Sequence, residues 1–266
     1  MKAILSDIHA NIAAIDAVMK DIRSHGISDE NIICLGDIVG YGPDPVECVD
    51  IAMNFRTNLM GNHDEAVVFE PMGFNIRALT AIRWTKHKLE PGLLSFANKK
   101  RIQFLKDLKI THREEGVMFV HGSPRQPTTE YILRGDVEDA NLGRNENKMK
   151  EICAKFDSVL CVAHTHIPCV IEQIPDSAAP TGFRYIYKSD KDLNYEFCPE
   201  PGKKYILNDG AVGQPRDGDP RACYVLWDGD TYRWVRLEYD FRKTMDKIYK
   251  IKELDDYNAD RLEIGA

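Results

Sequence analysis

Five short apolar segments of this 266-residue chain each end directly in a cluster of polar residues that can bind metal ions. The segments cover residues 2–6, 31–35, 57–60, 116–120 and 158–162. The clusters that follow them are Asp7-Ile8-His9, Gly36-Asp37, Gly61-Asn62-His63-Asp64, His121-Gly122 and Ala163-His164-Thr165-His166. Ligands of open α/β sheets bind at the carboxyl ends of strands. The pattern therefore predicts an α/β fold whose strands bring these clusters together.

The rest of the chain extends this arrangement without adding a second domain. Apolar residues at helical spacing predict two helices packed over the core, as an insertion at about residues 69–108. A β excursion is expected at about residues 172–204. We predict one domain over residues 1–240, followed by a docked amphipathic helix at residues 241–266.

The composition is that of a globular protein without a membrane partner. Hydrophobic residues make up 43% of the chain and charged residues 29%. No apolar run approaches the roughly 18 residues of a membrane span. Asp7 and His9 interrupt the first apolar run too early for a signal peptide, so we do not expect export.

The cysteines and the net charge exclude further classes of protein. Seven cysteines without a Cys-x-x-Cys pair indicate neither a disulfide framework nor a thiolate zinc site, and they fit a reducing cytoplasm. The formal net charge of −7 disfavours an extended surface for nucleic acid and suits a protein that holds cations. No feature of the sequence indicates an oligomeric state.

The clusters carry carboxylate, imidazole and carboxamide donors but no thiolate. Such a mixed nitrogen and oxygen set suits manganese, which we favour, or iron, zinc or nickel. The candidate metal ligands are Asp7, His9, Asp37, Asn62, His121, His164 and His166. A carboxylate such as Asp37 can bridge two cations through its separate oxygens, at a metal separation of about 3.5 to 4 Å when a hydroxide is shared. That hydroxide could attack a phosphate in line.

His63 is the candidate proton donor for the leaving oxygen, because it lies beside Asn62 but is not needed to complete either set of ligands. Asp64 could hold its tautomer or raise its pKa.

Each cluster has a less specific interpretation when it is taken alone. Asp7-Ile8-His9 is more often a strand cap or a turn than a metal site, and His164-Thr165-His166 also occurs in polar loops. The five together are more specific, because each follows an apolar strand. His25, His87 and His112 lack this setting, and we predict that they are surface or structural histidines.

The order of Asp-x-His, Gly-Asp, Gly-Asn-His-Asp, His-Gly and His-x-His resembles that of the calcineurin-like metallophosphoesterase superfamily, from Lys2 to Tyr239. The resemblance implies a four-layer α-β-β-α sandwich with two central mixed sheets and a dinuclear metal centre. It further implies the following ligand sets: Asp7, His9 and His166 with shared Asp37 for one metal, and Asp37, Asn62, His121 and His164 for the other. His63 matches the general acid of the family, and Asp64 its partner.

The loop after Asp37 points to one branch of the family. Protein phosphatases continue this loop into Asp-Arg-Gly, whereas this chain has no arginine between Gly36 and Pro45. Together with residues 213–220, the loop is similar to that of compact prokaryotic phosphoesterases, some of which act on phosphodiesters or dinucleoside polyphosphates. Ala163 replaces the usual glycine before His-x-His, and we expect only a slight change in how closely the backbone approaches the metals.

Three further residues are candidates for supporting roles. Asn11 could orient the first loop, and Tyr41 could face the substrate. Arg216 could neutralise a phosphate in place of the missing arginine, or it could form a surface ion pair with a neighbouring aspartate.

The sequence therefore predicts a phosphoesterase with two divalent metal ions that hydrolyses phosphodiester or phosphomonoester bonds of a small-molecule or nucleotide substrate. A protein Ser/Thr phosphatase and a non-catalytic scaffold of the same fold are the alternatives. An aspartyl-phosphate mechanism would require Asp-x-Asp after the first strand, where the chain has Asp7-Ile8-His9.

Overall fold

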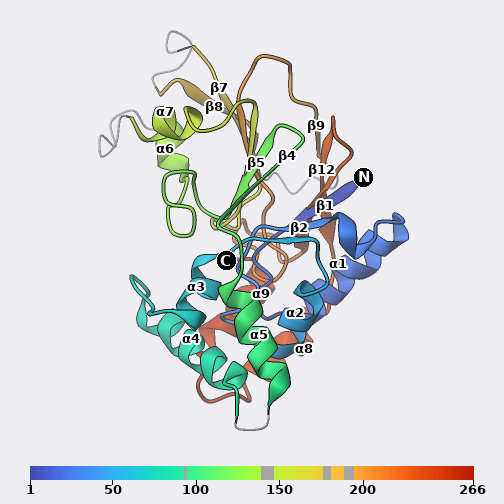
Figure 1. Ribbon diagram of the computed structural model, residues 1–266, viewed down its shortest axis with the longest axis vertical. Helices are drawn as coiled ribbons and strands as arrows, with labels where there is room; N and C mark the ends of the chain where they lie inside the picture. Colours follow the sequence, from blue (N-terminus) through green and yellow to red (C-terminus); the bar gives the residue numbers. More distant parts are fainter. Residues whose placement is uncertain (93–94, 139–146, 176–180, 189–194) are drawn as a thin grey trace.

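Two six-stranded mixed β-sheets form the centre of the computed structural model, and the helices lie outside them (Figure 1). The structure describes residues 1–92, 95–138, 147–175, 181–188 and 195–266. The first sheet has the strand order β3 (Thr57–Asn58), β2 (Ile32–Cys34), β1 (Lys2–Leu5), β11 (Ala222–Trp227), β12 (Tyr232–Leu237) and β9 (Glu196–Phe197). The second has the order β4 (Thr111–Glu114), β5 (Val117–Val120), β6 (Val159–Val162), β10 (Tyr205–Asn208), β7 (Cys169–Gln173) and β8 (Phe183–Lys188).

The α-helices of the described residues fall into groups at the two outer faces. They are α1 (Ile12–Ser24), α2 (Pro45–Ala52), α3 (Asn62–Val68), α4 (Ile76–Leu89), α5 (Phe96–Lys106), α6 (Arg134–Glu138), α7 (Lys148–Cys153), α8 (Phe241–Ile248) and α9 (Tyr257–Ile264).

Three apolar clusters separate four layers. One cluster joins the first sheet to α1 and α2 and includes Leu5 and Val18. A second lies between the two sheets and includes Ile4 and Phe119. The third joins the second sheet to α6 and α7 and includes Ile152. The layers are therefore α-β-β-α, which confirms the predicted sandwich.

The central strands are apolar at consecutive positions because both of their faces are buried. In β1, Ala3 and Leu5 pack toward the helices, whereas Ile4 packs between the sheets. β1, β2 and β3 run parallel in the first sheet, as do β5, β6 and β10 in the second. Loops that follow the carboxyl ends of these strands can therefore meet at one edge.

The tail differs from the sequence prediction. Residues 241–266 form two helices, α8 and α9, and not one. The chain turns after Ile248, which allows Leu254 and Leu262 to pack in one apolar cluster with Trp84 of α4. Burial of these side chains favours the turn over a continuous helix.

The two predicted insertions are described in part. The expected helical insertion contains α4 and α5, and its residues 93–94 lie outside the described residues. The expected β excursion contains β8 and β9, and its residues 176–180 and 189–194 also lie outside them. Among the helices that the structure describes, none has the length and apolar character needed to cross a membrane.

Two tryptophans between the sheets predict a difference in stability. Trp227 and Trp234 are each only 1% exposed. Nε1 of Trp234 donates to the carbonyl oxygen of Asn208 at 2.8 Å, across the sheets, whereas Nε1 of Trp227 has no hydrogen-bond partner among the described residues. Because Trp234→Phe removes a buried hydrogen bond, it should lower the free energy of unfolding by about 1 to 2 kcal/mol more than Trp227→Phe does. Denaturant titration of both variants measures this difference, and equal losses would contradict it.

Candidate metal centre

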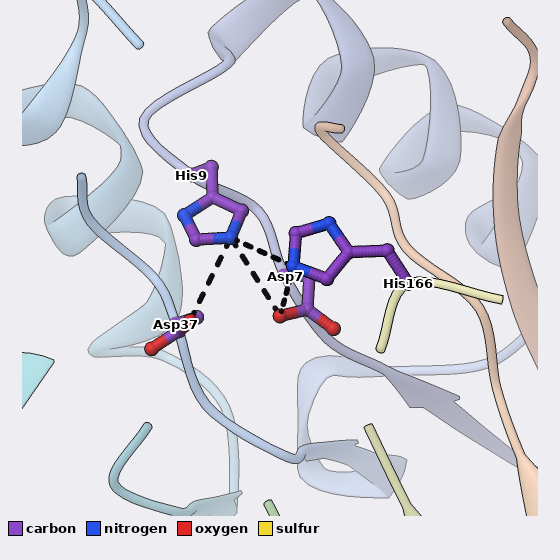
Figure 2. A group of neighbouring side chains, drawn as sticks. All are labelled: Asp7, His9, Asp37 and His166. Carbon is purple, nitrogen blue, oxygen red and sulfur yellow. Dashed lines mark hydrogen bonds and ion pairs between the residues drawn. The ribbon is translucent and has the colours of Figure 1, made fainter. Parts of the chain in front are cut away.

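Four candidate ligands from three loops surround one point beside the carboxyl ends of the central strands (Figure 2). Asp7 and His9 follow β1, Asp37 follows β2, and His166 follows β6. Nε2 of His166 lies 3.2 Å from Oδ1 of Asp7 and 3.2 Å from Nε2 of His9. Nε2 of His9 lies 3.6 Å from Oδ2 of Asp37. All four side chains are buried, and one ligand atom of each lies within 4.8 Å of the others.

A second group shares Asp37 with the first. Nε2 of His121, which follows β5, lies 3.5 Å from Oδ2 of Asp37 and 3.1 Å from Nδ1 of His164. Asn62 lines the same cavity as Asp37 and His164, and its buried Oδ1 has no hydrogen-bond partner in the described part of the chain. A buried oxygen without a donor is unfavourable unless a cation or a water molecule binds it. The structure thus brings Asp37, Asn62 and His164 to one cavity, and His121 lies beside Asp37 and His164.

Backbone carbonyl groups fix which nitrogen of each histidine carries a hydrogen. A carbonyl oxygen only accepts hydrogen bonds, so the nitrogen beside it must be the donor, and the other nitrogen of the neutral ring keeps its lone pair. The nitrogen and oxygen pairs are Nδ1 of His9 with Val39 (3.1 Å), Nδ1 of His121 with Leu35 (3.0 Å), Nδ1 of His166 with Gln214 (2.6 Å) and Nε2 of His164 with Thr129 (3.3 Å). Each remaining lone pair faces the ligand groups.

These residues fit divalent metal ions. In their neutral forms, the lone pairs of His9 and His166 face each other, as do those of His121 and His164, and only a cation or a proton between them makes such contacts favourable. Burial lowers the pKa of His121 to about 4 and that of His164 to about 2, which disfavours the proton. A metal ion is the remaining option, and imidazole with carboxylate suits a transition metal.

The two oxygens of Asp37 have different partners. Oδ1 accepts a hydrogen bond from the backbone N–H of His63 at 2.8 Å, whereas Oδ2 faces both His9 and His121. The sequence predicted that the separate oxygens of Asp37 bridge the two ions, whereas in the structure Oδ2 alone lies near histidines of both groups. Burial raises the pKa of Asp37, and the negative charges of Asp64 and Asp7 raise it further. A nearby cation would favour the ionised form.

Five of the candidate ligands adopt a left-handed backbone conformation. Their φ angles are 50° at Asp7, 47° at His9, 55° at Asp37, 68° at His164 and 61° at His166. Residues with a side chain rarely adopt this conformation, and it persists where the surrounding structure imposes it, often at functional sites.

Asp64 has another role than the one predicted. Its Oδ1 accepts hydrogen bonds from the backbone N–H groups of Ile38 (2.9 Å) and Val39 (3.2 Å), and its Oδ2 accepts one from Gly61 (3.1 Å). No hydrogen bond joins Asp64 to His63 in the described residues. Consecutive residues of a helix project about 100° apart, so the two side chains at the start of α3 diverge. Asp64 holds the loop after β2 against this helix.

His63 is positioned by packing. Its side chain is 3% exposed, and its Nδ1 has no hydrogen-bond partner among the described residues. The imidazole centroid lies 4.4 Å from that of Tyr41, 4.8 Å from that of His9 and 5.1 Å from that of Phe74. Gly40 leaves room for the ring, because a Cβ atom at position 40 would lie 2.3 Å from Nδ1 of His63.

Asn11 connects the first loop to the segment after β10. Its Oδ1 accepts from the backbone N–H of Ala14 at 3.2 Å and so caps α1. Its Nδ2 donates to the carbonyl oxygen of Gly213 at 2.8 Å and to the Tyr239 hydroxyl at 3.1 Å. These contacts are compatible with the predicted orienting role.

Arg216 lines the cavity of about 260 Å³ that also contains Asp37, Tyr41 and His63. Its Nη2 donates to Oε1 of Gln214 at 2.8 Å, and its guanidinium lies 5.7 Å from the centroid of Tyr41. The expected alternative, an ion pair with a neighbouring aspartate, does not occur among the described residues. The two neighbouring aspartates bind other arginines: Asp217 binds Arg236, and Asp219 binds Arg221.

Two residues that contact candidate ligands were not predicted from the sequence. The ring of Tyr131 stacks on His164, with centroids 3.7 Å apart and an angle of 15° between planes. No local pattern marks Tyr131. Oγ of Ser6 lies 2.8 Å from Oδ2 of Asp7 and 2.9 Å from Oδ1 of Asp209, and its one hydrogen can be donated to either oxygen. Asp209 follows the apolar strand β10, so the pattern that marked the ligands was also present there.

Comparisons with known proteins identify the family of this chain. The family profile described as the calcineurin-like phosphoesterase superfamily domain matches residues 1–231. An uncharacterised protein of Methanocaldococcus jannaschii is 33% identical over 271 residues, which span 100% of this chain and 98% of that protein.

Two crystal structures extend the comparison to the fold. A metallophosphoesterase from Sphaerobacter thermophilus is 32% identical and superposes with a TM-score of 0.76, over 99% of this chain and 98% of that one. A protein from Pyrococcus horikoshii superposes with a TM-score of 0.68 at 20% identity, over 100% of this chain and 98% of that one. At 20% identity, the similarity to the Pyrococcus horikoshii protein is evidence for the fold alone.

Burial of His121 predicts how the metal-free protein responds to acid. Its pKa is about 4 in the folded protein, against about 6.5 in an unfolded chain. As the pH falls below 6.5, the unfolded chain therefore binds the proton first, and stability is lost until the pH passes 4. Between pH 7 and pH 5, metal-free His121→Gln should lose about 2 kcal/mol less stability than the wild type.

Denaturant titration of chelator-treated protein at both pH values measures this difference. His87→Gln is the matched control, because the side chain of His87 is 78% exposed. It should behave like the wild type. An equal pH dependence in wild type and His121→Gln would contradict the assignment.

Proposed function

The chain belongs to the calcineurin-like phosphoesterase superfamily, and we propose that it is a phosphoesterase that uses two divalent metal ions. Its substrates would be phosphodiesters or phosphomonoesters of a small molecule or a nucleotide. The observation that carries this proposal is the position of Oδ2 of Asp37, 3.6 Å from Nε2 of His9 and 3.5 Å from Nε2 of His121. One oxygen that belongs to both ligand groups suits two neighbouring cations. We propose manganese, with iron, zinc or nickel as alternatives.

The residues around the ligands have distinct tasks in this proposal. When bound, two divalent ions would neutralise charge on the phosphate and lower the pKa of the attacking water. His63 would donate a proton to the leaving oxygen, because it lines the cavity beside Asp37 without belonging to either ligand group. Burial, and then the positive charge of Arg216, lowers the pKa of His63. A bound phosphate would oppose the effect of Arg216 and favour the protonated imidazole.

Arg216 would bind a phosphate oxygen in place of the arginine that the loop after Asp37 lacks. Its position in the same cavity as His63 and Tyr41 supports this role. The absence of an arginine from the loop after Asp37 argues against the protein phosphatase alternative. The two ligand groups, which contain six of the seven predicted ligands, argue against the scaffold alternative, and the seventh, Asn62, lines the adjoining cavity.

The first test concerns the shared carboxylate. Asp37→Asn should lower the metal content from about two equivalents per chain to one or fewer, because a neutral amide binds both ions less tightly than a carboxylate does. Elemental analysis after metal loading and desalting measures the content. Asp16→Asn, on an exposed position of α1, is the control and should retain the wild-type content. Retention of two equivalents by Asp37→Asn would contradict the bridging role.

The second test separates metal binding from proton donation. Protein stripped of metal and reloaded with Mn²⁺ should hydrolyse a p-nitrophenyl phosphomonoester or phosphodiester. His63→Gln should keep its metal and lose about 10²- to 10⁴-fold in kcat, as expected for removal of a general acid. His25→Gln, which changes a histidine outside the site, should retain the wild-type rate. Absence of turnover with Mn²⁺, Fe²⁺, Zn²⁺ and Ni²⁺ would refute the proposed phosphoesterase activity. Loss of metal in His63→Gln would refute the assignment of His63 as a proton donor that does not bind metal.

A further inference from the structure

A second cavity, of about 540 Å³, adjoins the metal cavity. Tyr41, Asn75, Tyr131 and Arg216 line both cavities and therefore lie at the boundary between them. The far wall of the second cavity comes from two helices, α4 with Arg77 and α9 with Arg261. The two helices pack against each other through one apolar cluster. Their arginines therefore extend into the cavity from helices that are held in place.

The second cavity is rich in positive charge. Three arginines line it, namely Arg77, Arg216 and Arg261, and Arg77 pairs with Asp255 at 3.2 Å. Arg216 and Arg261 form no salt bridge with a carboxylate side chain in the part of the chain that the structure describes. Nε of Arg216 is buried and has no hydrogen-bond partner among these residues, whereas Nε of Arg261 donates to the main-chain oxygen of Ala266.

Arg216 and Arg261 line the same cavity, where their positive charges repel each other. Burial, and then the positive charge of Arg216, lowers the pKa of Arg261 to about 10. Arginine side chains carry a positive charge, so this boundary contains positive charge that an anion would stabilise. The anion would need to reach both Arg216 and Arg261.

Two of the tyrosine rings that line the cavity already contact other side chains. Tyr131 stacks on His164. The ring of Tyr257 has the guanidinium of Arg77 at 4.7 Å and that of Arg261 at 5.3 Å from its centroid. The arginines that line the same cavity add planar cations, which bind phosphate oxygens in pairs.

We propose that this cavity binds a second phosphate group of the substrate while the scissile phosphate lies at the metal centre. The inference rests on the proposed phosphoesterase function and narrows it. The substrate class becomes nucleotide-like esters or anhydrides with at least two phosphate groups. Arg216, which lines both cavities, contacts either phosphate, and Arg261, which lines only the second cavity, contacts only the second.

Two chromogenic esters that differ by one phosphate test the proposal. They are thymidine 5′-(p-nitrophenyl phosphate) and its derivative with a 3′-phosphate, which share the scissile bond and the chromophore. The metal-loaded wild type should hydrolyse the bisphosphorylated ester with a kcat/KM about tenfold higher or more. In Arg261→Gln, the ratio of the two kcat/KM values should fall toward one, and Arg261→Lys should retain part of it.

Arg242→Gln is the matched control. Arg242 is exposed on α8 and does not line the cavity, so this variant should keep the wild-type ratio. Because the ratio compares two substrates on one protein, a partial loss of folded or metal-loaded enzyme cancels. A wild-type ratio near one, or a ratio that Arg261→Gln leaves unchanged, would overturn the proposal.

Different measurements test the phosphoesterase function and the second phosphate site. Hydrolysis of the ester with one phosphate reports the phosphoesterase function alone. If neither ester is hydrolysed, calorimetric titration of the metal-loaded protein with thymidine 3′,5′-bisphosphate and thymidine 5′-monophosphate decides the second proposal. Tighter binding of the bisphosphate, by about tenfold in the wild type and lost in Arg261→Gln, would support it. Equal affinities would overturn it.

Discussion

The buried carboxylate of Asp37 connects the two ligand groups to the start of α3. Oδ1 accepts from the amide of His63, and this contact turns Oδ2 toward the histidines of both groups. The approach is possible because position 61 is glycine: a Cβ atom there would lie 2.0 Å from Oδ1. Asp64 fixes the same loop from the other side through the N–H groups of Ile38 and Val39. A change at any of these contacts would therefore alter both ligand groups.

A rigid frame is required because the ligand loops are strained. Asp7 and His166 lie in the left-handed region of backbone conformation, which is unfavourable for residues with side chains. The loops begin at parallel strands that are buried on both faces, and the packing of the two sheets determines where each loop starts. Tertiary packing thus offsets the local strain, as in many binding sites whose geometry is preformed.

Some arginines of this region form ion pairs that support the fold, whereas others face a cavity. Arg236 and Arg221 bind Asp217 and Asp219, and these pairs hold the segment after β10. Arg216 lies in the same segment but faces the metal cavity. The turn between α8 and α9 then brings Arg261 to the same region. The tail that the sequence presented as one docked helix therefore contributes to the wall of a cavity.

Much of the fold and the identity of the candidate ligands could be predicted from the sequence. An apolar segment followed by Asp7-Ile8-His9, or by His164-Thr165-His166, is a local pattern, and local patterns determine strands and loop ends. The same pattern at Asp209 was hidden by the turn-forming residues around it. The family resemblance supplied the layers and the grouping of ligands.

By itself, the sequence determined which donor atoms are available, because donor chemistry depends on residue type alone. Only the tertiary structure decided which atoms face each other. His9 and His166 are 157 positions apart, and their contact depends on the packing of two sheets. The partners of Asp64, the single shared oxygen of Asp37 and the position of Arg261 are contacts of the same kind. No local pattern encodes them, since they arise when distant loops and helices pack together.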